Sequence, residues 1–97
     1  MSDVVTKPTL YNIVLTSADT EYTQLLPSGT KELRFRCRTS NIIRFAFVTG
    51  KVAGPTANYL TLPAGTDYFS DENDLTGLNI YFASSSAGVI VELEVWT

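Results

Sequence analysis

The stretch Tyr22-Thr-Gln-Leu-Leu-Pro-Ser-Gly-Thr30 returns later in the chain as Tyr59-Leu-Thr-Leu-Pro-Ala-Gly-Thr66. In both copies a short alternating run ends in Leu-Pro-Ser/Ala-Gly-Thr, and a second apolar run follows. Proline presets φ for the second position of a turn, and glycine supplies the positive φ that closes it. Because proline cannot donate to a sheet ladder, each one is predicted to end a strand. Each copy of the stretch therefore predicts a strand, a tight turn and a second strand.

The similarity continues beyond the two turns. Residues 41–47 resemble residues 78–83, and the alignment places Phe45 on Phe82. Two copies are too few for a solenoid, which needs at least three stacked units. We therefore expect a pseudo-symmetric pair of sheets within one domain.

Composition limits the classes of protein that fit. The chain has 97 residues, of which 44% are hydrophobic and 18% charged, values typical of one globular domain and not of a disordered chain. A net charge of -3 gives no reason to expect a nucleic-acid partner. No apolar stretch approaches the ~20 residues of a membrane helix, and no secretory signal pattern opens the chain. We expect no membrane partner and synthesis in the cytoplasm.

The usual catalytic residues are missing. Histidine is absent and Cys37 is the single cysteine, so zinc sites and Ser-His or Cys-His catalysis lack their ligands and bases. No pair of carboxylates suggests an acid and a base. We expect no enzymatic activity and no cofactor, and interpret Cys37 as a small hydrophobic residue within a strand.

Alternating apolar and polar residues predict strands throughout, and no segment has helical periodicity. The expected strands cover residues 10–16, 21–26, 32–38, 42–49, 59–62, 78–83 and 89–96. Turn signals recur every 8 to 12 residues or so, a spacing typical of a sandwich or jelly roll. We predict an all-β, single-domain antiparallel β-sandwich or jelly-roll-like fold of seven or eight strands with a pseudo-repeat, over residues 10–97. An extended N-terminal arm over residues 1–9 precedes it.

One predicted strand carries a stripe of arginines. Alternation over residues 32–38 directs Arg34, Arg36 and Arg38 to the face opposite Leu33, Phe35 and Cys37. In the last strand, Glu92 and Glu94 face outward. The stripe and these glutamates form either a surface ladder or two solvated faces, or the stripe is a docking site for an acidic surface of another subunit, where arginine pairs well with carboxylates. The two interpretations can share residues.

Three further residues are candidate partner contacts. Val4 and Val5 are the apolar residues of the N-terminal arm, which is either a frayed terminus or an arm that lies across a neighbouring subunit. Lys51, with Val52 beside it, belongs to the Gly/Pro-rich loop 50–56, and loops on a rigid sandwich commonly carry binding residues.

The acidic run 67–74 is a candidate cation site. It departs from the EF-hand pattern, because Leu75 and Thr76 stand where a ligand and the glycine belong. We interpret the run as a solvated loop between strands.

With these residues assembled, the chain resembles the small all-β virion proteins of tailed bacteriophages that decorate or cement the capsid. The resemblance rests on the Leu-Pro-Ser/Ala-Gly-Thr turns, on Ile-Arg-Phe-Ala-Phe at 43–47 and on Val-Glu-Leu-Glu-Val-Trp at 91–96. It implies a non-enzymatic structural protein on the capsid surface of the virion, a homo-oligomer that binds the major capsid protein or other virion subunits and stabilises the head. It transfers no site residues.

Two alternatives stay open. A tail, connector or fibre component of the same virion would use the same sandwich. A carbohydrate-binding module would need a row of exposed aromatic rings, for which Tyr11, Tyr59, Tyr68 and Trp96 are the candidates.

Overall fold

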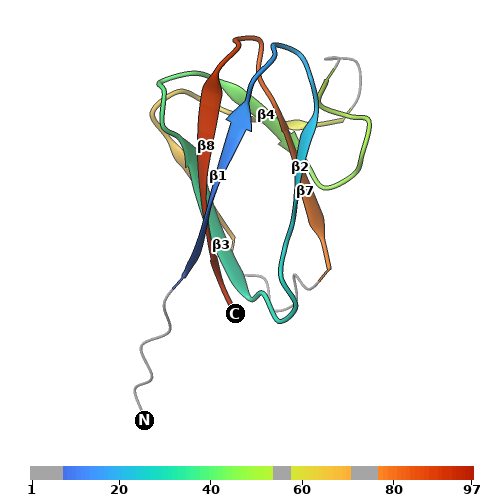
Figure 1. Ribbon diagram of the computed structural model, residues 1–97, viewed down its shortest axis with the longest axis vertical. Helices are drawn as coiled ribbons and strands as arrows, with labels where there is room; N and C mark the ends of the chain where they lie inside the picture. The colour runs from blue at the N-terminus through green and yellow to red at the C-terminus, as the bar shows by residue number, and fades with distance from the viewer. Residues whose placement is uncertain (1–7, 54–57, 71–76) are drawn as a thin grey trace.

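The computed structural model describes residues 8–53, 58–70 and 77–97 (Figure 1). This part of the chain is all-β, as predicted. Its eight strands are β1 (Thr9–Leu15), β2 (Tyr22–Leu25), β3 (Glu32–Cys37), β4 (Ile43–Ala46), β5 (Leu60–Leu62), β6 (Asp67–Ser70), β7 (Asn79–Ala83) and β8 (Val89–Trp96). None of the described residues forms a helix that could cross a membrane.

The strands form two four-stranded antiparallel sheets. Sheet A has the order β1-β8-β3-β6, and sheet B has the order β2-β7-β4-β5. Figure 1 shows β1, β8 and β3 in one layer and β2 and β7 in the other. An eight-stranded double sheet in which the chain crosses repeatedly between layers has the organisation of a jelly roll. The predicted sandwich or jelly-roll class is confirmed.

Each copy of the repeated sequence contributes to both sheets. The first copy leads from β2 in sheet B to β3 in sheet A, and the second leads from β5 in sheet B to β6 in sheet A. The expectation of a pseudo-symmetric pair of sheets is therefore wrong. The repeat is symmetric within sheet B, where β4 and β7 are central and β2 and β5 are edges, but in sheet A β3 is internal while β6 is an edge.

The two turns are alike in geometry. The amide of Thr30 donates to the carbonyl of Pro27 at 3.3 Å, and Gly29 has a φ of 82°; Thr66 and Pro63 repeat this bond at 3.3 Å, and Gly65 has a φ of 78°. We predicted the prolines at the second position of each turn, but they occupy the first position. The glycines stand at the third position, where a type II turn requires positive φ.

Aromatic rings fill the space between the sheets. Phe35 of β3 meets Phe45 of β4 and Phe82 of β7 edge-on, with ring centroids 4.8 and 5.0 Å apart. All three rings are buried. Edge-to-face contacts of this kind stabilise a core beyond the area they bury.

The acidic run does not begin as a loop. Its first four residues, Asp67–Ser70, form β6 and pair with β3, which corrects our interpretation of this part. Residues 71–74 of the run lie outside the described part of the chain. The alternation Asp-Tyr-Phe-Ser allows β6 to place Tyr68 against Phe35 and Phe45 in the core.

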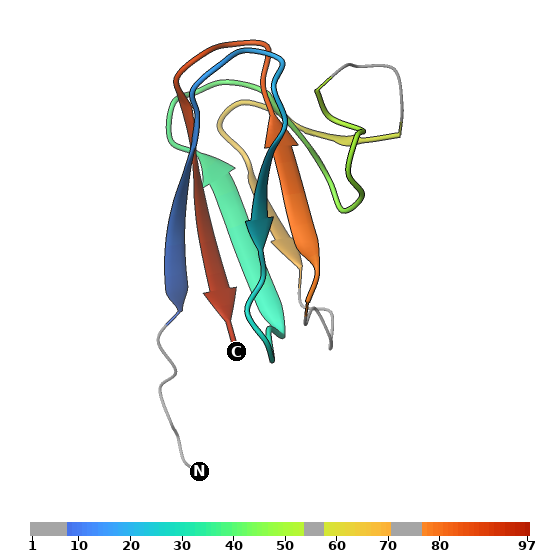
Figure 2. The same ribbon diagram turned by 45° about the vertical axis from the view of Figure 1, so that its right-hand side comes forward.

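The outer face of sheet B is partly covered by the segment that follows β4. Val52 is fully buried against Ala46 and Ala83, which face outward from β4 and β7. Figure 2 shows this segment on the outside of the sheet, to the right. Arg44 fixes it, because its Nε donates to the carbonyl of Val52 at 2.7 Å and its guanidinium pairs with Asp19 at 2.7 Å.

Candidate interaction surface

The outer face of sheet A presents side chains in rows that cross the four strands. Strand register sets the rows, since residues directly opposite each other share a face. One row contains Leu10, Glu94, Arg34 and Phe69, and the next contains Asn12, Glu92, Arg36 and Asp67. The arginine stripe of β3 therefore lies between the glutamates of β8 and the edge strand β6.

The predicted ladder between arginines and glutamates is present. Arg34 donates to Glu94 through Nε at 2.9 Å and also forms an ion pair with it through its terminal nitrogen. Glu92 accepts from two arginines, one on each carboxylate oxygen: Arg36 Nε at 3.0 Å and Arg38 Nε at 2.9 Å. Three arginines thus share two glutamates on this face.

The shared carboxylate is the electrostatic centre of the ladder. Hydrogen bonds from Arg38 and Arg36, followed by their positive charges, lower the pKa of Glu92 below its ordinary value. The hydrogen bond to Glu92 likewise raises the pKa of Arg36. Both groups therefore stay charged over the neutral range, and the face keeps its alternating charges.

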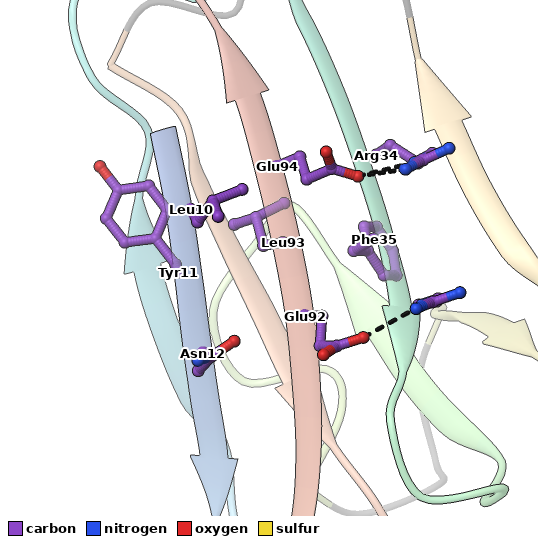
Figure 3. A pocket seen from close by; sticks show the side chains of 9 residues that line it. Leu10, Tyr11, Asn12, Arg34, Phe35, Glu92, Leu93 and Glu94 are labelled. Carbon is purple, nitrogen blue, oxygen red and sulfur yellow. Dashed lines mark hydrogen bonds and ion pairs between the residues drawn. The ribbon is translucent and has the colours of Figure 1, made fainter. Parts of the chain in front are cut away.

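A shallow depression of about 320 Å³ lies over the ladder. Figure 3 shows Glu92 and Glu94 on β8 reaching toward the arginines of β3, with Leu10 and Asn12 on the neighbouring strand β1. The side chain of Arg36 is 63% exposed and that of Arg34 is 47% exposed, so the guanidinium groups remain accessible at the rim of this hollow. An open, shallow and charged hollow fits a protein surface better than a small molecule, which prefers an enclosed apolar pocket.

The other sequence candidates lie elsewhere. Lys51 belongs to the segment outside sheet B, where it lines an apolar depression of about 400 Å³ with Phe47, Val48 and Leu60. The structure therefore does not bring Lys51 together with the arginines of sheet A. Val52, the neighbour of Lys51 in this loop, is fully buried and is a core residue of that segment. Val4 and Val5 lie outside the described residues.

Two apolar side chains beside the ladder were not recognised as a pair from the sequence. Leu10 and Val14 point outward from β1 and are 67% and 49% exposed. The signal was present, because the alternation that directs Ile13 and Leu15 into the core directs positions 10, 12 and 14 to the outside. Only the sheet order shows that these residues stand at an edge.

The two remaining candidates from the sequence are a metal site and a row of aromatic rings that could bind sugar. No group of three or more His, Cys, Asp or Glu side chains among the described residues is arranged to hold a metal ion. Tyr11 and Tyr68 pack against the main core, and Tyr59 packs against the cluster around Val52. These rings therefore do not form the exposed row that a sugar-binding platform requires.

Comparison with known proteins gives information on the fold. No protein-family model matches the chain, and no curated protein matches it. The chain is similar to a solution NMR structure of a de novo designed double-stranded β-helix, with a TM-score of 0.55 and 16% identity, over 95% of this chain and 100% of that chain. This likeness shows the fold alone. It agrees with the two antiparallel sheets described above.

Proposed function

We propose that the protein is a non-enzymatic structural component of a tailed-phage virion, a decoration or cement protein that docks on the major capsid protein through the outer face of sheet A. The observation that carries the proposal is the ladder itself. Three arginines share two glutamates on one open face, and the arginine side chains are about half exposed. The resemblance of the sequence to small all-β virion proteins supplies the identity of the partner.

Arginine suits this role for physical reasons. Its planar group offers five N–H donors, so a guanidinium that already holds one glutamate can also pair with a carboxylate on a second protein. The ladder holds the side chains in one arrangement before docking, which reduces the ordering cost of binding. On a particle with many equivalent positions, modest contacts of this kind act together through effective concentration.

The experiment is co-sedimentation with empty capsids of the same phage, comparing the natural protein with Arg36→Glu. We expect the variant to lose most of its binding, because the new carboxylate stands beside Glu92 and repels an acidic partner surface. Lys51→Glu is the matched control, since it makes the same charge change outside the opposite sheet. Circular dichroism verifies that both variants are folded.

The outcome also separates the alternatives. Saturation at many copies per particle supports decoration, whereas a few copies per particle indicate a tail, connector or fibre component. If Arg36→Glu binds capsids as well as the natural protein, the outer face of sheet A is not the docking surface. If Lys51→Glu alone weakens binding, the docking surface lies on the outer side of sheet B.

A further inference from the structure

Strand β1 is a long edge strand without charges. It pairs with β8 on one side, and no strand of the described chain lies on its other side. Thr9–Leu15 contains no charged residue. Proteins usually protect such edges with charges, with proline, with a cover or by keeping the strand very short.

The other three edges are better protected. The edge strands β2 and β5 of sheet B have four and three residues, and β6 of sheet A has four residues and begins with Asp67. With seven residues, β1 offers the longest unpaired backbone among the described strands. This contrast within one molecule singles out β1 as a place where another strand can add.

The side chains of β1 are arranged to match a second copy of themselves. Leu10 and Val14 flank Asn12 on the outer face, two positions to either side of it. An antiparallel partner centred on Asn12 places Leu10 of each copy directly opposite Val14 of the other. Apolar side chains then meet on the outer face, and the two asparagines, which can hydrogen-bond to each other, meet at the centre.

We propose that β1 pairs antiparallel with β1 of a second copy about a two-fold axis through Asn12, which joins the two A sheets into one continuous eight-stranded sheet. A two-fold axis makes the contact isologous, so it closes at two copies and does not propagate into a fibre. The inference rests on the fold and on the sequence of β1, and not on the proposed capsid role. The arginines of β3 are separated from β1 by β8, so the dimer leaves them accessible.

The contact is small compared with a standard protein interface, because it consists of one strand pair and its side chains. We therefore expect a reversible dimer whose fraction rises with concentration. Sedimentation equilibrium up to about 1 mM covers the range in which even weak association is populated. A protein that stays monomeric up to this concentration overturns the proposal.

Charge substitutions at the two apolar positions test the register. In the double variant Leu10→Lys with Val14→Lys, like charges face each other across the axis, and we expect the dimer to be lost. In Leu10→Lys with Val14→Glu, each new lysine faces the new glutamate of the second copy, and we expect the dimer to return. Leu25→Lys, at an exposed leucine of the edge strand β2, is the control and should leave association unchanged. Equal dimer fractions in both double variants would overturn the register.

A disulfide test reports the axis directly. Residues directly opposite in an antiparallel pair have Cα atoms about 4.5 to 5.5 Å apart, which a disulfide can span. In a Cys37→Ser background, Asn12→Cys should give a covalent dimer under mild oxidation. Thr23→Cys, on the edge strand β2, should stay monomeric. Cross-linking of both variants to the same extent, or of neither, contradicts the proposed axis.

Discussion

Phe45 and Phe82 are direct register partners across β4 and β7. They occupy equivalent positions of the repeated sequence, and both rings meet Phe35 of β3 edge-on. The two copies of the repeat thus meet at the centre of sheet B. Sheet A contributes the third ring, Phe35. This aromatic contact connects the two layers of the fold.

Truncation of the central ring should weaken the whole molecule. We expect Phe45→Ala to reduce the free energy of unfolding by about 3 to 5 kcal/mol, because a fully packed ring leaves a cavity between the sheets. Phe69→Ala is the matched control: Phe69 is 53% exposed on β6, and its truncation should cost less than about 1 kcal/mol. Urea denaturation of both variants makes the comparison. Equal losses would contradict the arrangement of the core.

The two turns allow one hydrogen bond to be compared in two environments. The hydroxyl of Thr30 donates to Pro27 at 2.6 Å and is buried, whereas that of Thr66 donates to Pro63 at 2.7 Å and is exposed. We expect Thr30→Val to destabilise the protein by about 1 to 2 kcal/mol and Thr66→Val by less, because water can replace the lost bond only at the exposed turn. Thermal and urea denaturation of the two variants test this order.

Arg44 holds the segment after β4 against sheet B. Its side chain is 11% exposed and bonds to Asp19 and to the carbonyl of Val52. We expect Arg44→Met to cost about 1.5 to 3 kcal/mol, the range for hydrogen bonds to charged groups. Arg44→Lys should rescue little, because an ammonium lacks the forked geometry that reaches both acceptors.

Hydrogen exchange of the amides around Val52 provides the second readout for this prediction. These amides should exchange faster in Arg44→Met, while the amides of β8 should exchange as slowly as in the natural protein. Arg36→Met is the control, because Arg36 is exposed and its ion pair should contribute little to stability. Unchanged exchange around Val52 would show that Arg44 does not fix the segment.

The arginine ladder should make the free energy of unfolding depend on pH. The pKa of Glu92 is lowered in the folded protein, chiefly by hydrogen bonds from Arg38 and Arg36, so the unfolded chain binds a proton at this group more readily than the folded chain. The contribution of Glu92 is therefore complete above its ordinary pKa of 4.5 and is lost as the pH falls through the lowered value.

We expect the free energy of unfolding to decrease below pH 4.5, and to decrease less steeply in Glu92→Gln. Glu32→Gln, which removes one carboxylate outside the ladder, is the matched control. Urea titrations at several pH values measure these slopes. The same slope in Glu92→Gln and in the natural protein would contradict the role of the shared carboxylate.

Local chemistry explains why most strands could be predicted. The strand β8 covers the predicted residues 89–96. The strand β3 differs from its predicted bounds by one residue at its end, and β1 by one residue at each end. Alternation with period 2 is a property of each strand, so it also predicted the outward direction of Arg34 and Arg36. The partners of these arginines were predicted because β8 offers glutamates with the same alternation.

Contacts between distant segments could not be predicted in the same way. Ala46 alternates with Phe45 and so faces outward from β4, yet it is buried because Val52 covers it. The role of Asp67–Ser70 as a strand was missed, since acidic residues disfavour strands unless an edge position and a partner such as β3 compensate.

The sequence by itself determined all the strands except β6, the faces that these strands present and the two Leu-Pro turns, because these depend on residues close together in the chain. The tertiary structure alone decided the sheet order, and with it the sharing of each repeat between both sheets and the place of β1 at an open edge. The physical reason is that alternation directs a side chain inward or outward but does not select a neighbouring strand. That choice depends on how the rings of Phe35, Phe45 and Phe82 pack together between the layers.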